Sequence, residues 1–172
     1  MPGERDAAFG RAGLPALPEL TPLVAEAEAA RDDQDAGALE EVGLRFIGAV
    51  IALQRGRRTN RAPANARDEK RVTTALRRIE EAPQASLTLS TLARDAGTSP
   101  FHFLRIFRQV AGVTPHQFIL RMRLHRAALR LRRGAEAITD IAYDCGFNDL
   151  STFNRRFRRL MGIPPGVWRT MR

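Results

Sequence analysis

The chain has 172 residues, of which 44% are apolar, so it is long enough for one small domain with an additional segment or for two small units. It contains a single cysteine, which excludes an intramolecular disulfide and a metal site built from several cysteines. No stretch approaches the roughly 20 apolar residues that span a bilayer, and the first residues lack the pattern of a signal peptide. We therefore expect a cytoplasmic protein with no membrane partner.

The net charge of +9 is unevenly placed along the chain. Residues 1–67 hold nine arginines and ten acidic residues, whereas residues 68–172 hold nineteen basic residues and nine acidic ones. An excess of positive charge confined to one part of a chain points to a polyanionic partner, most simply nucleic acid. A genome that favours arginine codons would explain the preference for Arg over Lys, but it would not explain the shortage of acidic residues.

The first third of the chain is predicted to be a tail, a pair of helices and a linker. Residues 1–13 have no periodic pattern and are expected to be disordered. Residues 14–54 are predicted to form a helical hairpin, with helices over about 22–31, capped by Thr21, and about 38–54. The hairpin has more apolar surface than it can bury alone, which leaves open a homodimer or docking onto the second half. Residues 55–67 are polar and aperiodic, and we interpret them as a linker.

The second half contains the same pattern twice. In each copy a short amphipathic helix is followed by a glycine and by a second helix rich in Phe and Arg, which is typical of a helix-turn-helix unit. The first helices align at an offset of 49, pairing Leu89, Leu92, Ala93 and Ala96 with Ile138, Ile141, Ala142 and Cys145. The second helices align at an offset of 50, pairing Phe103, Phe107, Gly112 and Pro115 with Phe153, Phe157, Gly162 and Pro165. A repeat at this period indicates a duplicated supersecondary unit.

The predicted fold is therefore all-α, with two helix-turn-helix subdomains joined by a long linker helix and preceded by the hairpin. The elements expected after residue 67 are a helix over 68–82, helix-turn-helix one over about 88–111, the linker helix over 114–133 and helix-turn-helix two over about 137–161. Asn148 is expected to cap the second helix of the second unit, next to Asp149. The linker helix has two apolar stripes and should contact both units. Its length of roughly 30 Å is close to the about 34 Å of one DNA turn, so one chain could enter two successive major grooves.

Residues 68–172 resemble the DNA-binding domain of the AraC/XylS family of bacterial transcription regulators. The residues that carry the resemblance are Leu92-Ala93, Gly97, Ser99-Pro100, Arg105, Phe107, Gly112, Pro115, Arg123-Leu124, Ala127, Ile141-Ala142, Cys145-Gly146-Phe147, Phe153, Arg155, Phe157, Gly162 and Pro164-Pro165. The resemblance implies a two-lobed domain of seven helices that binds promoter DNA, usually as an activator, with RNA polymerase as a candidate partner. Residues 14–54 resemble only the helices that follow the sensor barrel of longer members, so small-molecule sensing is not expected.

The resemblance also assigns roles to individual positions. The base-contacting positions are Phe101, Leu104 and Arg105 in the first unit and Leu150, Ser151, Asn154 and Arg155 in the second. Arg105 and Arg155 can each offer a forked pair of donors to guanine, and a salt bridge within the lobe is the alternative for both. Phe101 and Leu104 could read a thymine methyl group, or the first unit could contribute mainly affinity for the backbone. The candidates for phosphate contact are Thr98, Ser99, His102, Arg108, Asn148, Arg158 and Arg159.

The remaining reactive side chains fit structural roles better than chemical ones. His102, His116 and His125 fall on different helical faces, so surface or phosphate-contact roles are favoured over a metal or acid–base role. Cys145 occupies a position where the repeat requires a small apolar residue, and we expect it to be buried. Trp168 is expected to anchor the core. We therefore predict no catalytic residue, no cofactor and no metal.

Three functions are compatible with this pattern. The leading hypothesis is a sequence-specific transcription regulator, most simply an activator. The alternative is a dimerising architectural or interfering fragment that occupies DNA without recruiting polymerase. A remote alternative is the accessory domain of a DNA-repair methyltransferase. Such an enzyme needs a nucleophilic cysteine in its own domain, and one cysteine inside a helix-turn-helix argues against it.

Overall fold

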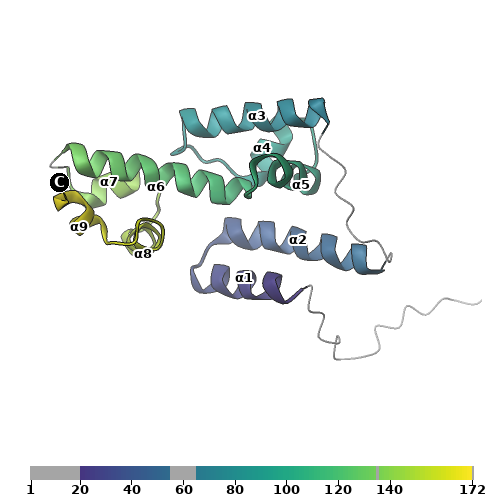
Figure 1. Cartoon of the computed structure of the whole chain (residues 1–172), viewed down its shortest axis with the longest axis horizontal. Coiled ribbons are helices and arrows are strands. Elements are labelled where there is room, and N and C mark those ends of the chain that lie inside the picture. Colours follow the sequence, from purple (N-terminus) through teal and green to yellow (C-terminus); the bar gives the residue numbers. More distant parts are fainter. Residues whose placement is uncertain (1–19, 55–64, 135, 172) are drawn as a thin grey trace, which may run out of the picture.

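The computed structural model describes residues 20–54, 65–134 and 136–171 (Figure 1). These residues form nine α-helices and no strand: α1 (Thr21–Asp32), α2 (Ala36–Gln54), α3 (Ala66–Glu81), α4 (Leu89–Asp95), α5 (Pro100–Ala111), α6 (Pro115–Arg133), α7 (Ile138–Asp144), α8 (Leu150–Met161) and α9 (Pro165–Thr170). The predicted all-α fold is confirmed. The predicted tail at 1–13, the first part of the hairpin segment and most of the predicted linker lie outside the described residues. Every described helix is too short or too polar to cross a lipid bilayer.

The first lobe consists of α3, α4, α5 and the N-terminal half of α6. Its core is built from fully buried apolar side chains, among them Val72, Ile79, Leu92, Phe103 and Phe107. The amphipathic spacing of α3 places its apolar residues toward α5, and these two helices pack together. The side chain of Asn65 accepts a hydrogen bond from the backbone N–H of Asp68 at 2.9 Å. Because of this cap, α3 begins two residues before the predicted start.

The second lobe consists of α7, α8, α9 and the C-terminal half of α6. Its core contains Phe153 and Phe157 at the positions that the repeat predicts. Cys145 is fully buried in this core, and burial raises the pKa of its thiol, which confirms its packing role. The Trp168 ring contacts Phe157 edge-on, and its Nε1–H donates to the carbonyl oxygen of Ala128 at 3.1 Å. The indole therefore anchors α9 to α6, as the sequence predicts.

Helix α6 belongs to both cores. Ile119 lies in the core of the first lobe, whereas Leu124, Ala127 and Leu131 lie in the core of the second. The two stripes predicted for this helix are confirmed. Nineteen residues of helix span about 28 Å. Because one rigid helix is part of two close-packed cores, the separation of the lobes is fixed by its length.

The side chain of Arg123, halfway along α6, connects the two lobes. Its guanidinium donates to the carbonyl oxygens of Pro83 at 2.7 Å and Ala85 at 2.9 Å, which follow α3 in the first lobe. It also donates to the carbonyl oxygen of Gly146 at 2.7 Å, in the turn of the second helix-turn-helix. Gly146 has a φ of +90°, and a Cβ at this position would lie 3.0 Å from the guanidinium. Glycine is therefore required here by both backbone conformation and close approach.

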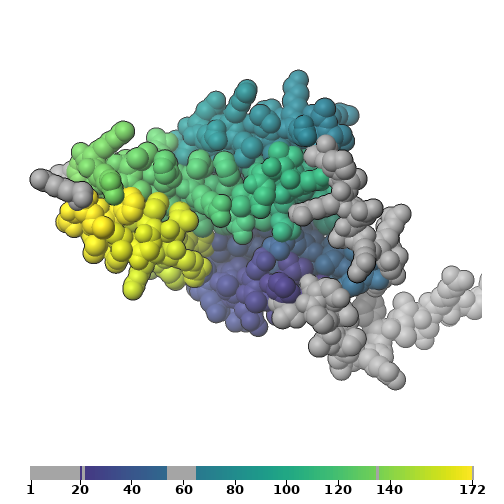
Figure 2. All heavy atoms as spheres, in the orientation of Figure 1, coloured from purple at the N-terminus to yellow at the C-terminus, as the bar shows by residue number. Residues whose placement is uncertain are grey.

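Helices α1 and α2 form the predicted hairpin and lie alongside α6, with the turn between them next to α8 (Figure 1). Figure 2 shows the atoms of this hairpin in contact with those of the two lobes. Leu44 of α2 packs against the core of the first lobe, and Glu40 accepts a hydrogen bond from the Ser90 hydroxyl at 3.1 Å. Of the two alternatives left open by the sequence, the structure shows docking onto the second half.

Replacing Arg123 by Ala should destabilise the protein by about 2–4 kcal/mol, because three partly buried carbonyl groups lose a charged donor. Arg123→Lys should not restore the stability, since an ammonium group cannot reproduce the planar fork. The measurement is the urea midpoint by circular dichroism. Arg121→Ala, which removes an exposed arginine from the same helix, is the control and should change stability by less than about 0.5 kcal/mol. Equal midpoints for Arg123→Ala and Arg121→Ala would contradict the bridging role.

Candidate nucleic-acid interface

Helix α5 is the candidate recognition helix of the first lobe. It follows α4 after a turn in which Gly97 has a φ of +61°. Its first turn contains Pro100, and the Ser99 side chain accepts from the backbone N–H of His102 at 3.3 Å. Phe103 and Phe107 fix one face of the helix in the core. The opposite face is therefore turned outward.

The outward face of α5 carries two of its three predicted base-contacting residues. Phe101 is exposed, and so is Arg105. The prediction for Leu104 is wrong, because this side chain is only 2% exposed and belongs to the core of the first lobe. Leu104 is one helical turn before Phe107, and residues three apart share one side of a helix. In the docked arrangement that the structure shows, its side chain is therefore not presented to a base edge.

Arg105 is held by a chain of polar contacts. One of its terminal nitrogens lies 3.2 Å from Nδ1 of His102, whose Nε2 lies 3.5 Å from the carboxylate of Asp68. Asp68 also accepts from Arg71 at 3.0 Å. Burial raises the pKa of Asp68, but the bonds from Arg71 and His102 outweigh it, so this pKa is lowered overall. His102, which was predicted to contact phosphate, therefore also orients Arg105.

Helix α8 is the candidate recognition helix of the second lobe. Its N-terminal cap is Asp149, which accepts from the backbone N–H of Thr152 at 2.7 Å, whereas the sequence prediction assigned this role to Asn148. The hydrogen bond from Thr152 lowers the pKa of the Asp149 carboxyl. The cap lies one residue later than predicted, because the turn before α8 is one residue longer than the turn before α5. Asn148 is exposed next to the cap.

The outward face of α8 is polar and basic. Leu150 is half-buried and packs against the second core, so it can offer only part of its surface to a ligand. The predicted contact residues that the structure places on the exposed side are Ser151, Asn154, Arg155, Arg158 and Arg159. Arg156, which was not predicted to have a role, is only 8% exposed. In the first unit, Thr98 and Arg108 are half-buried and Ser99 is exposed.

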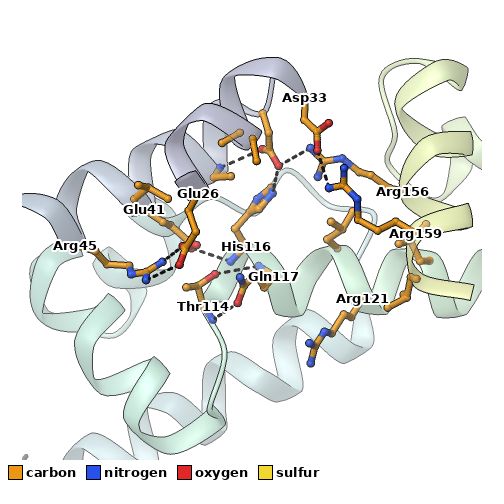
Figure 3. A pocket seen from close by; sticks show the side chains of 18 residues that line it. Glu26, Asp33, Glu41, Arg45, Thr114, His116, Gln117, Arg121, Arg156 and Arg159 are labelled. Carbon is orange, nitrogen blue, oxygen red and sulfur yellow. Dashed lines mark hydrogen bonds and ion pairs between the residues drawn. The ribbon is translucent and has the colours of Figure 1, made fainter. Parts of the chain in front are cut away.

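The turn between α1 and α2 contacts this basic face (Figure 3). Asp33 accepts from Nε of Arg155 at 2.9 Å and from Arg159 at 3.0 Å. Asp35 accepts from Arg156 at 2.5 Å. Arg155 therefore forms a salt bridge with the hairpin, and not within its own lobe as the alternative predicted. We call Asp33 and Asp35 the acidic turn.

His116 belongs to the same contact. Its Nε2 lies 2.8 Å from Asp35, and its backbone N–H donates to Glu41 at 2.8 Å. The surface or phosphate-contact role predicted for His116 is thus wrong, because the hairpin covers it. Burial raises the pKa of Asp35, but hydrogen bonds from His116, Ala38 and Arg156 outweigh burial and hold this pKa well below its usual range.

Sequence reasoning missed the residues that join distant parts of the chain. The acidic turn contacts Arg156, although more than 120 positions of sequence separate them. Arg123 donates to carbonyl groups that precede α6 in the sequence and to one that follows it. The available signal for the acidic turn was the acidic run at 32–35, opposite in charge to α8. Among the described residues, no group of three or more His, Cys, Asp or Glu side chains is placed to hold a metal ion.

The structure contains two helix-turn-helix units that share α6. Each unit presents a capped helix with arginines on its outward face, and this arrangement defines a double helix-turn-helix protein. Residues 92–171 match a family described as "Helix-turn-helix domain". The transcriptional activator RhaS of Citrobacter koseri is 30% identical over 162 residues, which are 92% of this chain and 57% of RhaS. The chain thus spans little more than half the length of the RhaS relatives it matches.

Two solved structures extend the comparison. The chain resembles a transcriptional regulator from Chromobacterium violaceum, described as having an AraC-type DNA-binding domain, with 28% identity, a TM-score of 0.55 and coverage of 61% of this chain and 94% of that one. It also resembles the DNA-binding domain of AdpA in complex with a target DNA, with 26% identity, a TM-score of 0.55 and coverage of 57% and 88%. These similarities confirm the resemblance to the AraC/XylS family noted in the sequence.

Replacing Asp149 by Ala should lower the thermal midpoint at pH 7 and should weaken the start of α8. Since the pKa of Asp149 is lowered in the folded protein, its charged form adds stability above the ordinary pKa of 3.8, and this contribution is lost as the pH falls through the lower native value. The difference between wild type and variant should therefore shrink below pH 3.8. Asn148→Ala is the matched control. A larger loss for Asn148→Ala than for Asp149→Ala would show that the cap is misassigned.

Proposed function

We propose that the chain is a sequence-specific DNA-binding transcription regulator that inserts α5 and α8 into successive major grooves of promoter DNA. The observation that carries the proposal is the pair of outward-facing recognition helices on one shared helix of about 28 Å. This length is near the repeat of one DNA turn, about 34 Å, so slight bending of the duplex would bring both helices into register. The excess of basic residues in this half supplies the attraction for phosphate.

Each exposed side chain suits a particular contact. Arg105 and Arg155 can donate two hydrogen bonds to guanine, and Asn154 can pair with adenine in the same way. Ser151 can bond to several bases, and the exposed ring of Phe101 can contact a thymine methyl group. The residues assigned to phosphate contact are Thr98, Ser99, His102, Arg108, Asn148, Arg158 and Arg159, which would set the position of the protein without reading the sequence.

The direction of regulation is proposed to be activation in the bacterial cytoplasm, with RNA polymerase as the partner recruited. The support is that the RhaS relatives are named as activators. The alternative is a DNA-occupying protein that does not recruit polymerase. A promoter–reporter assay separates the two, because an activator raises transcription and a passive occupant lowers it or leaves it unchanged.

A homodimer through the hairpin is the second proposed partnership. The hairpin keeps apolar side chains on its surface after docking, namely Val24, Leu39, Ile47 and Ile51. A second copy could cover these residues and bring four recognition helices to one promoter. Sedimentation equilibrium tests this proposal, and a monomer at the highest protein concentration used would contradict it.

Replacing Arg105 by Ala should relax the base preference at one position of the binding site and should weaken binding by roughly 1–3 kcal/mol. The measurement is selection from a random duplex library followed by sequencing. Arg77→Ala removes the same charge from an exposed position on α3 and serves as the control, with an unchanged preference. An unchanged preference for Arg105→Ala would refute its role in reading the sequence.

Affinity for DNA should fall steeply as the salt concentration rises, because each phosphate contact releases counterions. Arg158→Ala should weaken binding to all sequences alike, and it should reduce the slope of log affinity against log salt by about 1. Fluorescence anisotropy at several salt concentrations gives the slope. A slope near zero in the wild type would contradict backbone contact altogether.

A further inference from the structure

We propose that the acidic turn between α1 and α2 is an autoinhibitory contact that competes with DNA for the recognition helix α8. In the docked arrangement seen here, the turn binds the arginines that the second lobe would use on the duplex. DNA binding by α8 would then require the turn to leave this face. This inference rests on the proposed function, because it assumes that Arg155 and Arg159 contact DNA.

The first step is that one carboxylate binds two arginines of the same helix face. Oδ1 of Asp33 lies 2.9 Å from Nε of Arg155. Oδ2 of Asp33 lies 3.0 Å from a terminal nitrogen of Arg159 (Figure 3). The backbone carbonyl of Asp33 also accepts from Arg155 at 3.3 Å. These oxygens occupy the donors that would otherwise meet a phosphate or a guanine. Arg155 cannot make both sets of hydrogen bonds at once.

The second step is that the hairpin contacts both candidate recognition helices. At the far end of α2 from the acidic turn, a Cβ on Gly48 would lie 2.8 Å from the ring of Phe101, so the backbone of α2 lies directly against this exposed residue of α5. The hairpin therefore contacts Phe101 at one end and Arg155 at the other. A docked hairpin and a duplex would meet the same side chains in both lobes.

The third step is that the two aspartates have different functions in the contact. Asp35 binds Arg156, which is only 8% exposed, and His116, so it anchors the turn to the body of the domain. Asp33 binds two arginines that keep substantial exposure, with 42% of the Arg155 side chain and 64% of the Arg159 side chain accessible. Asp33 can therefore be changed without removing the anchor.

The fourth step is that the contact of the hairpin with α6 and α8 separates more easily than either lobe unfolds. A cavity of about 330 Å³ separates the hairpin from α6 and α8, with charged residues of both sides around it (Figure 3). Within the described residues, the buried Nε atoms of Arg45 and Arg156, which both line this cavity, have no hydrogen-bond partner. A polar contact that surrounds a cavity and leaves donors without partners stabilises the folded state less than a close-packed core does. The hairpin is therefore the part of the described structure that separates first.

A different role for the same ion pairs gives the opposite expectation. If Asp33 served to hold Arg155 in the orientation that reads DNA, its removal would weaken binding. If Asp33 competes with DNA, its removal strengthens binding. The sign of the change in affinity therefore decides between an inhibitory and a supporting turn.

The experiment compares Asp33→Asn with Asp32→Asn in the full chain. Asp32 is exposed and pairs with its neighbour Arg31, so its replacement removes the same charge one residue away without touching α8. Affinity is measured by fluorescence anisotropy for a duplex obtained by selection and for random DNA, at one salt concentration. Asp33→Asn should bind the selected duplex about fivefold or more tightly than wild type, and Asp32→Asn should differ by less than about twofold.

The outcomes separate the two proposals. If wild type and Asp32→Asn prefer the selected duplex and Asp33→Asn binds it no more tightly than they do, the proposed function stands and the inhibitory turn is overturned. If no variant, Asp33→Asn included, prefers the selected duplex to random DNA, the proposed function fails and the inhibition fails with it.

Hydrogen–deuterium exchange on the wild type gives a second measurement that needs no variant. The backbone N–H of His116 donates to the Glu41 side chain at 2.8 Å across the contact, so its exchange reports on docking of the hairpin. Addition of the selected duplex should increase exchange at His116, because DNA displaces the hairpin. Increased protection of His116 on DNA binding would overturn the proposal.

Discussion

The relative orientation of the two candidate recognition helices depends on one guanidinium group. Arg123 donates to two carbonyl oxygens of the first lobe and to the Gly146 carbonyl at the turn that leads into α8. Burial lowers the pKa of this arginine, yet the group stays charged because its ordinary pKa is so high. The helix that carries it lies in both cores, so spacing and orientation are set by the same element. Everything proposed about simultaneous groove contact follows from this arrangement.

The chain joins two kinds of contact. Within and between the lobes, interlocking phenylalanines and the carbonyl bonds of Arg123 make a close-packed body. Between the hairpin and that body, ion pairs surround a cavity. Close packing resists partial opening because each side chain that is uncovered loses many neighbours, whereas ion pairs to exposed arginines, such as that of Asp33 with Arg159, can be exchanged for other ions at little cost. This contrast gives the protein a fixed DNA-binding body and a hairpin that can be displaced from it.

The sequence predicted the features that depend on local pattern. The two units, the bounds of α6 and the burial of Cys145 followed from periodicity, glycine spacing and the repeat. Leu104 was misplaced because the resemblance was given more weight than the helical period, which puts this residue one turn before the buried Phe107. The cap of α8 was missed by one residue, since two adjacent side chains are both good caps. The acidic turn could not be paired with α8, because a charge run has no periodicity and its partners lie far along the chain.

The two recognition helices carry different outward side chains, Phe101 and Arg105 on α5 but Ser151, Asn154 and Arg155 on α8, and the turn before α8 is one residue longer. A stretch of DNA that satisfies both helices of one molecule is consequently non-palindromic. A single bound molecule then has a front and a back along the duplex, and the polarity of its site relative to a gene determines which surface it presents to whatever assembles at the start of transcription.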